Sequence, residues 1–307
     1  MSTVASLTGE LALAREAVAG RLRGVDPADF PALRQAYDAF AENDPLPEGV
    51  GQSVISLAGL NCLGVLPQGA SGDHVLLWLH GGGYVLGSPT SHRGLVSAIA
   101  AVAKCAAVIP DYRLAPEHPW PAAQDDCVAA YKAVLAEGVP AAQIILAGDS
   151  AGAALALATA LQLKAEGVGA PAGLMLLSPW VDMACNGWSY SAKAQRDPFL
   201  TQSGLRVRAG QYLGAIAAND RRIDLLSADL RGLPPVFIQT GEAEIVLSDS
   251  TTLAERLGAS GSPVTLEIWP DMFHVFQARY AMLNQARQAI DRLGVWVAAH
   301  IKGSPIA

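Results

Sequence analysis

The stretch QIILAGDSAG, residues 143–152, decides the fold. An apolar run of strand length, residues 143–147, leads into a serine flanked by glycines, and the Ala-rich stretch 151–166 that follows favours a helix. The pattern G-x-S-x-G between a strand and a helix is typical of a nucleophile elbow, a sharp turn that exposes a serine hydroxyl at the end of a strand. Glycines permit a turn in which a Cβ would clash. We therefore predict that Ser150 is a nucleophile.

A second glycine-rich motif, HGGG at residues 80–83, follows the apolar run Val75–Leu79. Three consecutive glycines leave backbone N–H groups unshielded, and such a loop commonly faces a nucleophilic serine and binds an oxyanion. We expect the N–H groups of Gly81, Gly82 and Ala151 to be the donors, each worth about 3 kcal/mol in the transition state. A phosphate-binding loop is the alternative, but neither G-x-x-x-x-G-K-[ST] nor G-x-G-x-x-G is present. The two motifs together indicate acyl transfer.

The general base should be a histidine late in the chain, because the order Ser–acid–His accompanies an elbow of this kind. His274 ends the string WPDMFH, residues 269–274, in a loop that leaves the predicted strand Val264–Trp269. We therefore predict His274 as the base.

The acid that orients this histidine should lie on the loop after the predicted strand Val236–Thr240. That loop carries three carboxylates, Glu242, Glu244 and Asp249. The acid must be buried, hold one histidine tautomer and stabilise the imidazolium that forms. Glu244 lies at the inner end of the loop before an apolar run, which favours it. Asp249 is the alternative, although a carboxylate near a helix N-terminus is stabilising in its own right.

Strand-like and helix-like stretches alternate along most of the chain, which indicates an α/β fold with a mainly parallel sheet covered by helices on both faces. The first 45 residues have a helical pattern, and residues 54–66 suit two short strands. Residues 181–231 contain no strand-like run and are too many for an ordinary loop, so we interpret them as a lid over the sheet. The expected strands are 75–79, 106–110, 143–147, 173–177, 236–240 and 264–269, and the expected helices are 91–104, 122–137, 151–166, 247–257 and 278–300.

The composition limits the possible partners and cofactors. The chain has 307 residues, 51% of them hydrophobic, and a formal net charge of −7. This charge argues against nucleic acid or an anionic membrane as the main partner. No apolar stretch is long enough to span a membrane, and the N-terminus lacks the pattern of a signal peptide, so we expect a cytoplasmic protein. The four cysteines have no metal-binding spacing and are expected to be free thiols, with no metal site.

With these residues in place, the chain resembles the hormone-sensitive lipase-like esterases of the α/β-hydrolase superfamily, in the bacterial branch marked by GDSAG. The resemblance rests on HGGGY (80–84), DYRLAPEHPWPAA (111–123), GDSAG (148–152), SPW (178–180), GLPP (232–235) and HVFQ (274–277). It implies a catalytic domain made of residues 46–180 and 232–307. It also implies a helical cap made of residues 1–45 and 181–231. The family usually has Asp where this chain has Glu244, thirty residues before His274 (274 − 244 = 30).

The resemblance implies a carboxylesterase for short- to medium-chain acyl esters that needs no metal or organic cofactor. Homodimers are common in this branch, so a homodimer is possible. An amidase, a lactonase or a deacetylase would use the same motifs, and a non-catalytic small-molecule receptor is a further alternative. Asp111 and Arg113 are expected to form an ion pair that braces loops under the site. Candidate pocket residues, which core packing would explain equally well, are Tyr84, Trp180, Phe199, Leu200 and Tyr212.

Overall fold

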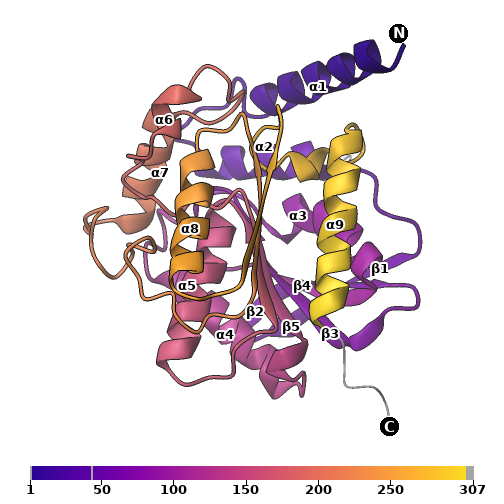
Figure 1. Cartoon of the computed structure of the whole chain (residues 1–307), viewed down its shortest axis with the longest axis vertical. Coiled ribbons are helices and arrows are strands. Elements are labelled where there is room, and N and C mark those ends of the chain that lie inside the picture. The colour runs from indigo at the N-terminus through magenta and orange to yellow at the C-terminus, as the bar shows by residue number, and fades with distance from the viewer. Residues whose placement is uncertain (1, 43, 302–307) are drawn as a thin grey trace.

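The computed structural model describes residues 2–42 and 44–301, and its centre is one eight-stranded sheet (Figure 1). The strand order is β1-β2-β4-β3-β5-β6-β7-β8. β1 and β2 form an antiparallel hairpin that joins β4, and all strand pairs from β4 to β8 are parallel. The predicted fold class, a mostly parallel sheet flanked by helices, is confirmed. The strands are β1 (Val50–Leu57), β2 (Leu60–Pro67), β3 (Ser71–Leu79), β4 (Cys105–Pro110), β5 (Ile144–Asp149), β6 (Gly173–Leu177), β7 (Val236–Gly241) and β8 (Val264–Trp269).

Helices cover both faces of this sheet. In Figure 1, α4, α5 and α8 lie on one side of the strands, and α3 and α9 lie on the other. The central strands β5, β6 and β7 are buried along their whole length, which is why they read as continuous apolar runs. The helices are α1 (Ser2–Gly20), α2 (Phe30–Glu42), α3 (Pro89–Ala103), α4 (Ala122–Ala136), α5 (Ala151–Ala165), α6 (Ser189–Ala192), α7 (Gln202–Leu213), α8 (Leu247–Ala259) and α9 (Asn284–His300).

The last predicted helix, 278–300, is interrupted in the structure. A 3₁₀ turn occupies Phe276–Arg279, and α9 begins only at Asn284. Leu283 is extended and completely buried in a cluster with residues of α1, so its side chain packs where a continuous helix would not place it. Tertiary packing has overridden local helix preference here.

The predicted pair of Asp111 and Arg113 does not form. Arg113 instead binds Asp126 of α4, with its Nη2 2.7 Å from Oδ1. The backbone N–H of Arg113 donates to the same carboxylate at 2.9 Å, so one acid fixes both the main chain and the side chain. The four cysteines are buried and free, as the sequence predicts. None of the described helices is long and apolar enough to cross a membrane.

Gly294 lets α9 approach α3 closely. A Cβ at this position would lie 2.5 Å from the Cβ of Val102 at the end of α3. We expect Gly294→Ala to lower the free energy of unfolding by about 1–3 kcal/mol, because it over-packs the helix contact. Gly210→Ala in α7 is the matched control, since no atom lies within 4 Å of its added Cβ. The control should gain about 0.5–1 kcal/mol from helix propensity. Urea denaturation measures both changes, and equal stability of the two variants would contradict the prediction.

Candidate active site

Ser150 lies at a strained turn between β5 and α5. Its φ of 54° and ψ of −120° are an uncommon conformation for a residue with a side chain, and such strain costs on the order of 1–3 kcal/mol. The turn is held because the Ser150 N–H donates to Leu177 O at 2.8 Å. A Cβ on Gly148 would lie 2.5 Å from the carbonyl carbon of Gly152, and one on Gly152 would lie 2.5 Å from His80 O. Only glycine fits at both flanking positions.

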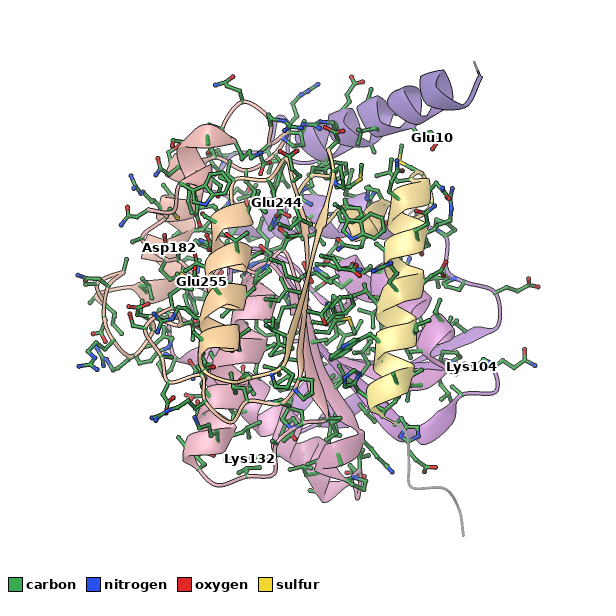
Figure 2. All side chains as sticks on the ribbon, in the orientation of Figure 1. Glu10, Lys104, Lys132, Asp182, Glu244 and Glu255 are labelled. Atoms are coloured by element: carbon green, nitrogen blue, oxygen red, sulfur yellow. The ribbon has the colours of Figure 1, made fainter. Side chains whose placement is uncertain are left out.

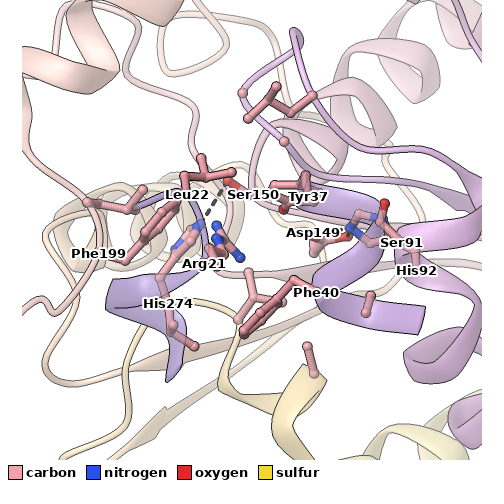
Figure 3. Close-up of a pocket in the computed structure, with 18 of the residues that line it drawn as sticks. Arg21, Leu22, Tyr37, Phe40, Ser91, His92, Asp149, Ser150, Phe199 and His274 are labelled. Atoms are coloured by element: carbon pink, nitrogen blue, oxygen red, sulfur yellow. Dashed lines mark hydrogen bonds and ion pairs between the residues drawn. The ribbon is translucent and has the colours of Figure 1, made fainter. Parts of the chain in front are cut away.

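His274 joins Ser150 to Glu244. Its Nε2 lies 2.8 Å from Ser150 Oγ, the contact dashed in Figure 3, and its Nδ1 lies 2.5 Å from Glu244 Oε2. A carboxylate can only accept, so the neutral ring carries its proton on Nδ1 and accepts from the serine at Nε2. The loops after β5, β7 and β8 thus bring together three groups that are far apart in the sequence.

Glu244 is completely buried, and donors fix its second oxygen. Oε1 accepts from Ser178 Oγ at 2.9 Å, from Thr240 Oγ1 at 2.7 Å and from the Gly241 N–H. Figure 2 labels Glu244 in the upper half of the view, whereas the exposed Lys104 and Lys132 are labelled in the lower half. Donors of this kind hold a carboxylate in one orientation. They therefore fix the position in which Glu244, whose side chain is longer than that of Asp, contacts His274.

Asp249, the alternative acid, has different partners. Its Oδ2 accepts from the N–H groups of Val181 and Asp182, each at 2.9 Å, and from the Tyr190 hydroxyl at 3.2 Å. Burial raises the pKa of Asp249 to about 8. The described structure contains no hydrogen bond between this carboxyl group and His274. Asp249 therefore anchors the start of the 181–231 segment.

The prediction that Gly81 is an oxyanion donor is wrong. The Gly81 N–H is buried and already donates to Asp149 Oδ1 at 3.1 Å and to His92 Nε2 at 3.2 Å. Gly82 and Gly83 are partly exposed instead and line the same cavity as Ser150. Neither of their N–H groups has a partner among the described residues. Ala151 is the first residue of α5, so its N–H has no acceptor within the helix.

Asp149 is a structural residue of the site that the sequence reasoning missed. Its carboxylate also accepts from Trp78 Nε1 at 3.1 Å and lies 3.3 Å from His92 Nε2. Burial by itself raises the pKa of Asp149, but His92, His80 and the Gly81 N–H together hold it below its ordinary value. Asp149, the acid next to Ser150, therefore connects the glycine loop to the elbow.

A cavity of about 250 Å³ opens onto Ser150 and His274. Phe199 and Leu200 line it, as the sequence suggests. The other candidates, Tyr84, Trp180 and Tyr212, do not line this cavity. All three are buried and pack against one another. The Tyr84 ring is stacked on that of Tyr212, with 3.7 Å between the ring centroids, and is tilted against that of Trp180, with 5.7 Å between the centroids. The sequence reasoning missed the lining residues from α1, α2 and the turn after α1: Val18, Arg21, Leu22, Tyr37, Phe40 and Ala41.

Among residues 2–42 and 44–301, no three His, Cys, Asp or Glu side chains are arranged to hold a metal ion.

We expect the buried His80 to make the stability of the fold depend on pH. Its imidazole is buried and stacked 4.1 Å from the ring of Tyr112, and burial together with His92 lowers its pKa to about 3. An unfolded histidine titrates near pH 6.5, so the unfolded state binds more protons between about pH 6.5 and 3. Stability should therefore fall as the pH drops through this window, by up to about 1.4 kcal/mol per pH unit from this residue.

We expect His80→Gln, although less stable at pH 7, to show a shallower loss of unfolding free energy between about pH 7 and 4.5. Urea denaturation at several pH values measures the slope. His118→Gln is the control, because the His118 side chain is exposed. A slope in His80→Gln as steep as that of the wild type would contradict the prediction.

The comparisons with known proteins agree with this architecture. A family model described as alpha/beta hydrolase fold matches residues 76–278. An acetyl-hydrolase of Streptomyces hygroscopicus is 40% identical over 269 residues, which cover 87% of each chain. An esterase of Acinetobacter venetianus is 35% identical over 260 residues, covering 84% of this chain and 86% of the relative.

Solved structures are similar over almost the whole chain. An esterase from the bacterial hormone-sensitive lipase family superposes with a TM-score of 0.91 at 36% identity, covering 98% of this chain and all of the other. A hormone-sensitive lipase from a metagenome library has a TM-score of 0.91 at 40% identity, covering 95% of this chain and 98% of the other. The chain therefore belongs to the alpha/beta hydrolase fold family, among the bacterial hormone-sensitive lipase-like esterases, and is a serine ester hydrolase.

Proposed function

We propose that this enzyme hydrolyses short- to medium-chain carboxylic esters with Ser150 as nucleophile, His274 as general base and acid, and Glu244 as the acid that orients the histidine. The observation that carries the proposal is the unbroken chain from Ser150 Oγ through His274 to the buried Glu244 carboxylate. The elbow, the histidine and the acid each follow a different parallel strand at one edge of the sheet.

The first half of the reaction forms an acyl-enzyme. Ser150 Oγ attacks the ester carbonyl carbon while its proton passes to His274 Nε2, and the C=O electron pair moves onto the oxygen. When that pair returns, the bond to the alkoxy oxygen breaks, and the alcohol leaves with the proton from Nε2. In the second half, water attacks the acyl-enzyme and gives its proton to Nε2. Ser150 then recovers a proton as the carboxylic acid departs.

The oxyanion is stabilised by the N–H groups of Gly82, Gly83 and Ala151. Two facts support this set: these groups have no partner among the described residues, and the two glycines line the cavity at Ser150. Backbone donors fixed before the reaction need no reorganisation when charge develops on the oxygen.

The size of the cavity supports a small acyl group. Its volume of about 250 Å³ lies below the range of roughly 300–1,000 Å³ that is typical of sites for drug-sized ligands. The name of the Streptomyces relative specifies acetyl removal, and the structure of a related esterase, EstE5, was soaked with p-nitrophenyl butyrate. Both names concern short acyl groups.

The residues that line this cavity indicate which segments form the cap. We assign residues 1–45 and 181–231 to the cap and residues 46–180 and 232–307 to the catalytic domain, because α1, α2 and α7 supply lining residues opposite Ser150. The homodimer and the cytoplasmic location stay predictions.

Hydrolysis of p-nitrophenyl esters with acyl chains of two to sixteen carbons tests the proposed function. We expect kcat/KM to peak at short to medium chains, because longer chains exceed the cavity. Ser150→Ala should reduce kcat by about 10⁶-fold, because no other nucleophile is in place. A peak at sixteen carbons would contradict the chain-length range, and near-normal turnover by Ser150→Ala would contradict the nucleophile.

The identity of the acid is tested by two matched substitutions. Glu244→Gln removes the charge that holds the Nδ1–H tautomer of His274, so kcat should fall by about 10⁴-fold. Asp249→Asn keeps an acceptor oxygen for the Val181 and Asp182 N–H groups and should retain kcat within a few-fold. Circular dichroism shows whether each variant is folded. The opposite pattern, with only Asp249→Asn inactive, would exclude Glu244 as the acid.

A further inference from the structure

Arg21 brings a positive charge that has no carboxylate ion-pair partner among the described residues into the cavity at Ser150. It lies in the turn after α1 and lines the cavity together with Ser150 and His274 (Figure 3). Its guanidinium carbon lies 3.6 Å from the ring centroid of Phe199 and 4.6 Å from that of Tyr37. Its Nε is buried without a hydrogen-bond partner. Among the described residues, no carboxylate forms a salt bridge with Arg21.

The other charged residues of the cavity offset this charge only in part, through Asp149 at a distance. Arg279 is already paired with Asp44, at 2.6 Å. Arg208 of α7 donates to the amide oxygen of Gln211, at 3.1 Å, and has no carboxylate partner among the described residues. Asp149 is the one acidic side chain among the described lining residues, and its oxygens are occupied by Trp78, Gly81 and His92. The cavity is therefore electropositive, although the whole chain has a net charge of −7.

A guanidinium that lies partly out of water without a counter-ion is unfavourable. Burial lowers the pKa of Arg21, although Tyr37 and Asp149 act in the opposite direction. A bound anion would remove this penalty, and the planar fork of arginine matches a carboxylate with two parallel hydrogen bonds. Apolar side chains next to it, such as Leu22 and Phe199, would contact the hydrocarbon part of the same molecule.

We propose that this cavity selects esters that carry a carboxylate group, which Arg21 binds while Ser150 attacks the ester bond. Arg208 lines the same cavity, also has no carboxylate partner among the described residues, and adds to the attraction. The inference rests on the proposed esterase function and names its substrate class. The chemical step is unchanged: the ester is cleaved, and the carboxylate takes no part in bond making.

Matched pairs of esters test this selectivity. Monoethyl glutarate differs from ethyl pentanoate only by a carboxylate in place of the terminal methyl group, which puts the charge on the acyl side. The pair 3-acetoxypropanoate and propyl acetate puts it on the alcohol side. We expect the wild type to prefer the anionic ester in at least one pair, by about tenfold in kcat/KM, measured in a pH-stat. Preference for the neutral ester in both pairs would overturn the proposal.

Variants of Arg21 separate anion binding from packing. Arg21→Gln should lower the ratio of kcat/KM for the anionic ester to that for its neutral partner by about 10- to 100-fold, the range for loss of a charged hydrogen bond. Arg21→Lys keeps the charge and should retain part of the ratio. Arg23→Gln removes the same charge at an exposed position two residues away and should leave the ratio unchanged. An equal loss for both esters in Arg21→Gln would show that Arg21 only packs against Phe199 and Tyr37.

A binding measurement keeps the inference independent of turnover. Glutarate is titrated calorimetrically into Ser150→Ala and into Ser150→Ala/Arg21→Gln, with thermal unfolding as a check on folding. We expect glutarate to bind the first protein and to bind the second about tenfold more weakly. Equal affinity, or no binding to either protein, would overturn the anion site. If the wild-type enzyme hydrolysed none of the esters but Ser150→Ala still bound glutarate, only the proposed function would be contradicted.

Discussion

The close approach of two glycine-rich segments, residues 80–83 and 148–152, is the constraint on which the site depends. A side chain on Gly152 would collide with the backbone of the first segment, and Asp149 holds the Gly81 N–H across the gap. These contacts place the open N–H groups of Gly82 and Gly83 in the cavity beside the serine. The same compact junction therefore positions Ser150 and the N–H groups that we propose as oxyanion donors.

Two buried carboxyl groups five residues apart in the sequence, those of Glu244 and Asp249, have different roles because their hydrogen-bond donors differ. Glu244 presents one oxygen to His274, while Ser178, Thr240 and Gly241 hold the other. Asp249 binds the backbone where the 181–231 segment leaves the sheet. One acid therefore orients the histidine, and the other fixes the base of the segment that carries Phe199, Leu200 and Arg208 over the cavity.

The cavity combines a reaction centre on the sheet loops with a lining of the kind that can differ between chains of the same fold. Sheet loops supply Ser150 and His274, whereas the N-terminal segment and α7 supply Arg21 and Arg208. Because neither of these partly buried cations has a carboxylate partner among the described residues, we expect charge as well as volume to control substrate choice. The chemistry and the selectivity thus come from different parts of the chain.

The sequence by itself determined the α/β fold, the elbow at Ser150 and the pairing of that elbow with a late histidine, because these follow from local periodicity and short motifs. It could not decide between Gly81 and Gly83 as an oxyanion donor, because the choice depends on whether the Asp149 carboxylate accepts from the Gly81 N–H. It could not show that Arg113 binds Asp126, that Tyr84, Trp180 and Tyr212 pack together, or that Arg21 enters the cavity. Only the tertiary structure decided these points, since each depends on contacts between residues distant in the chain.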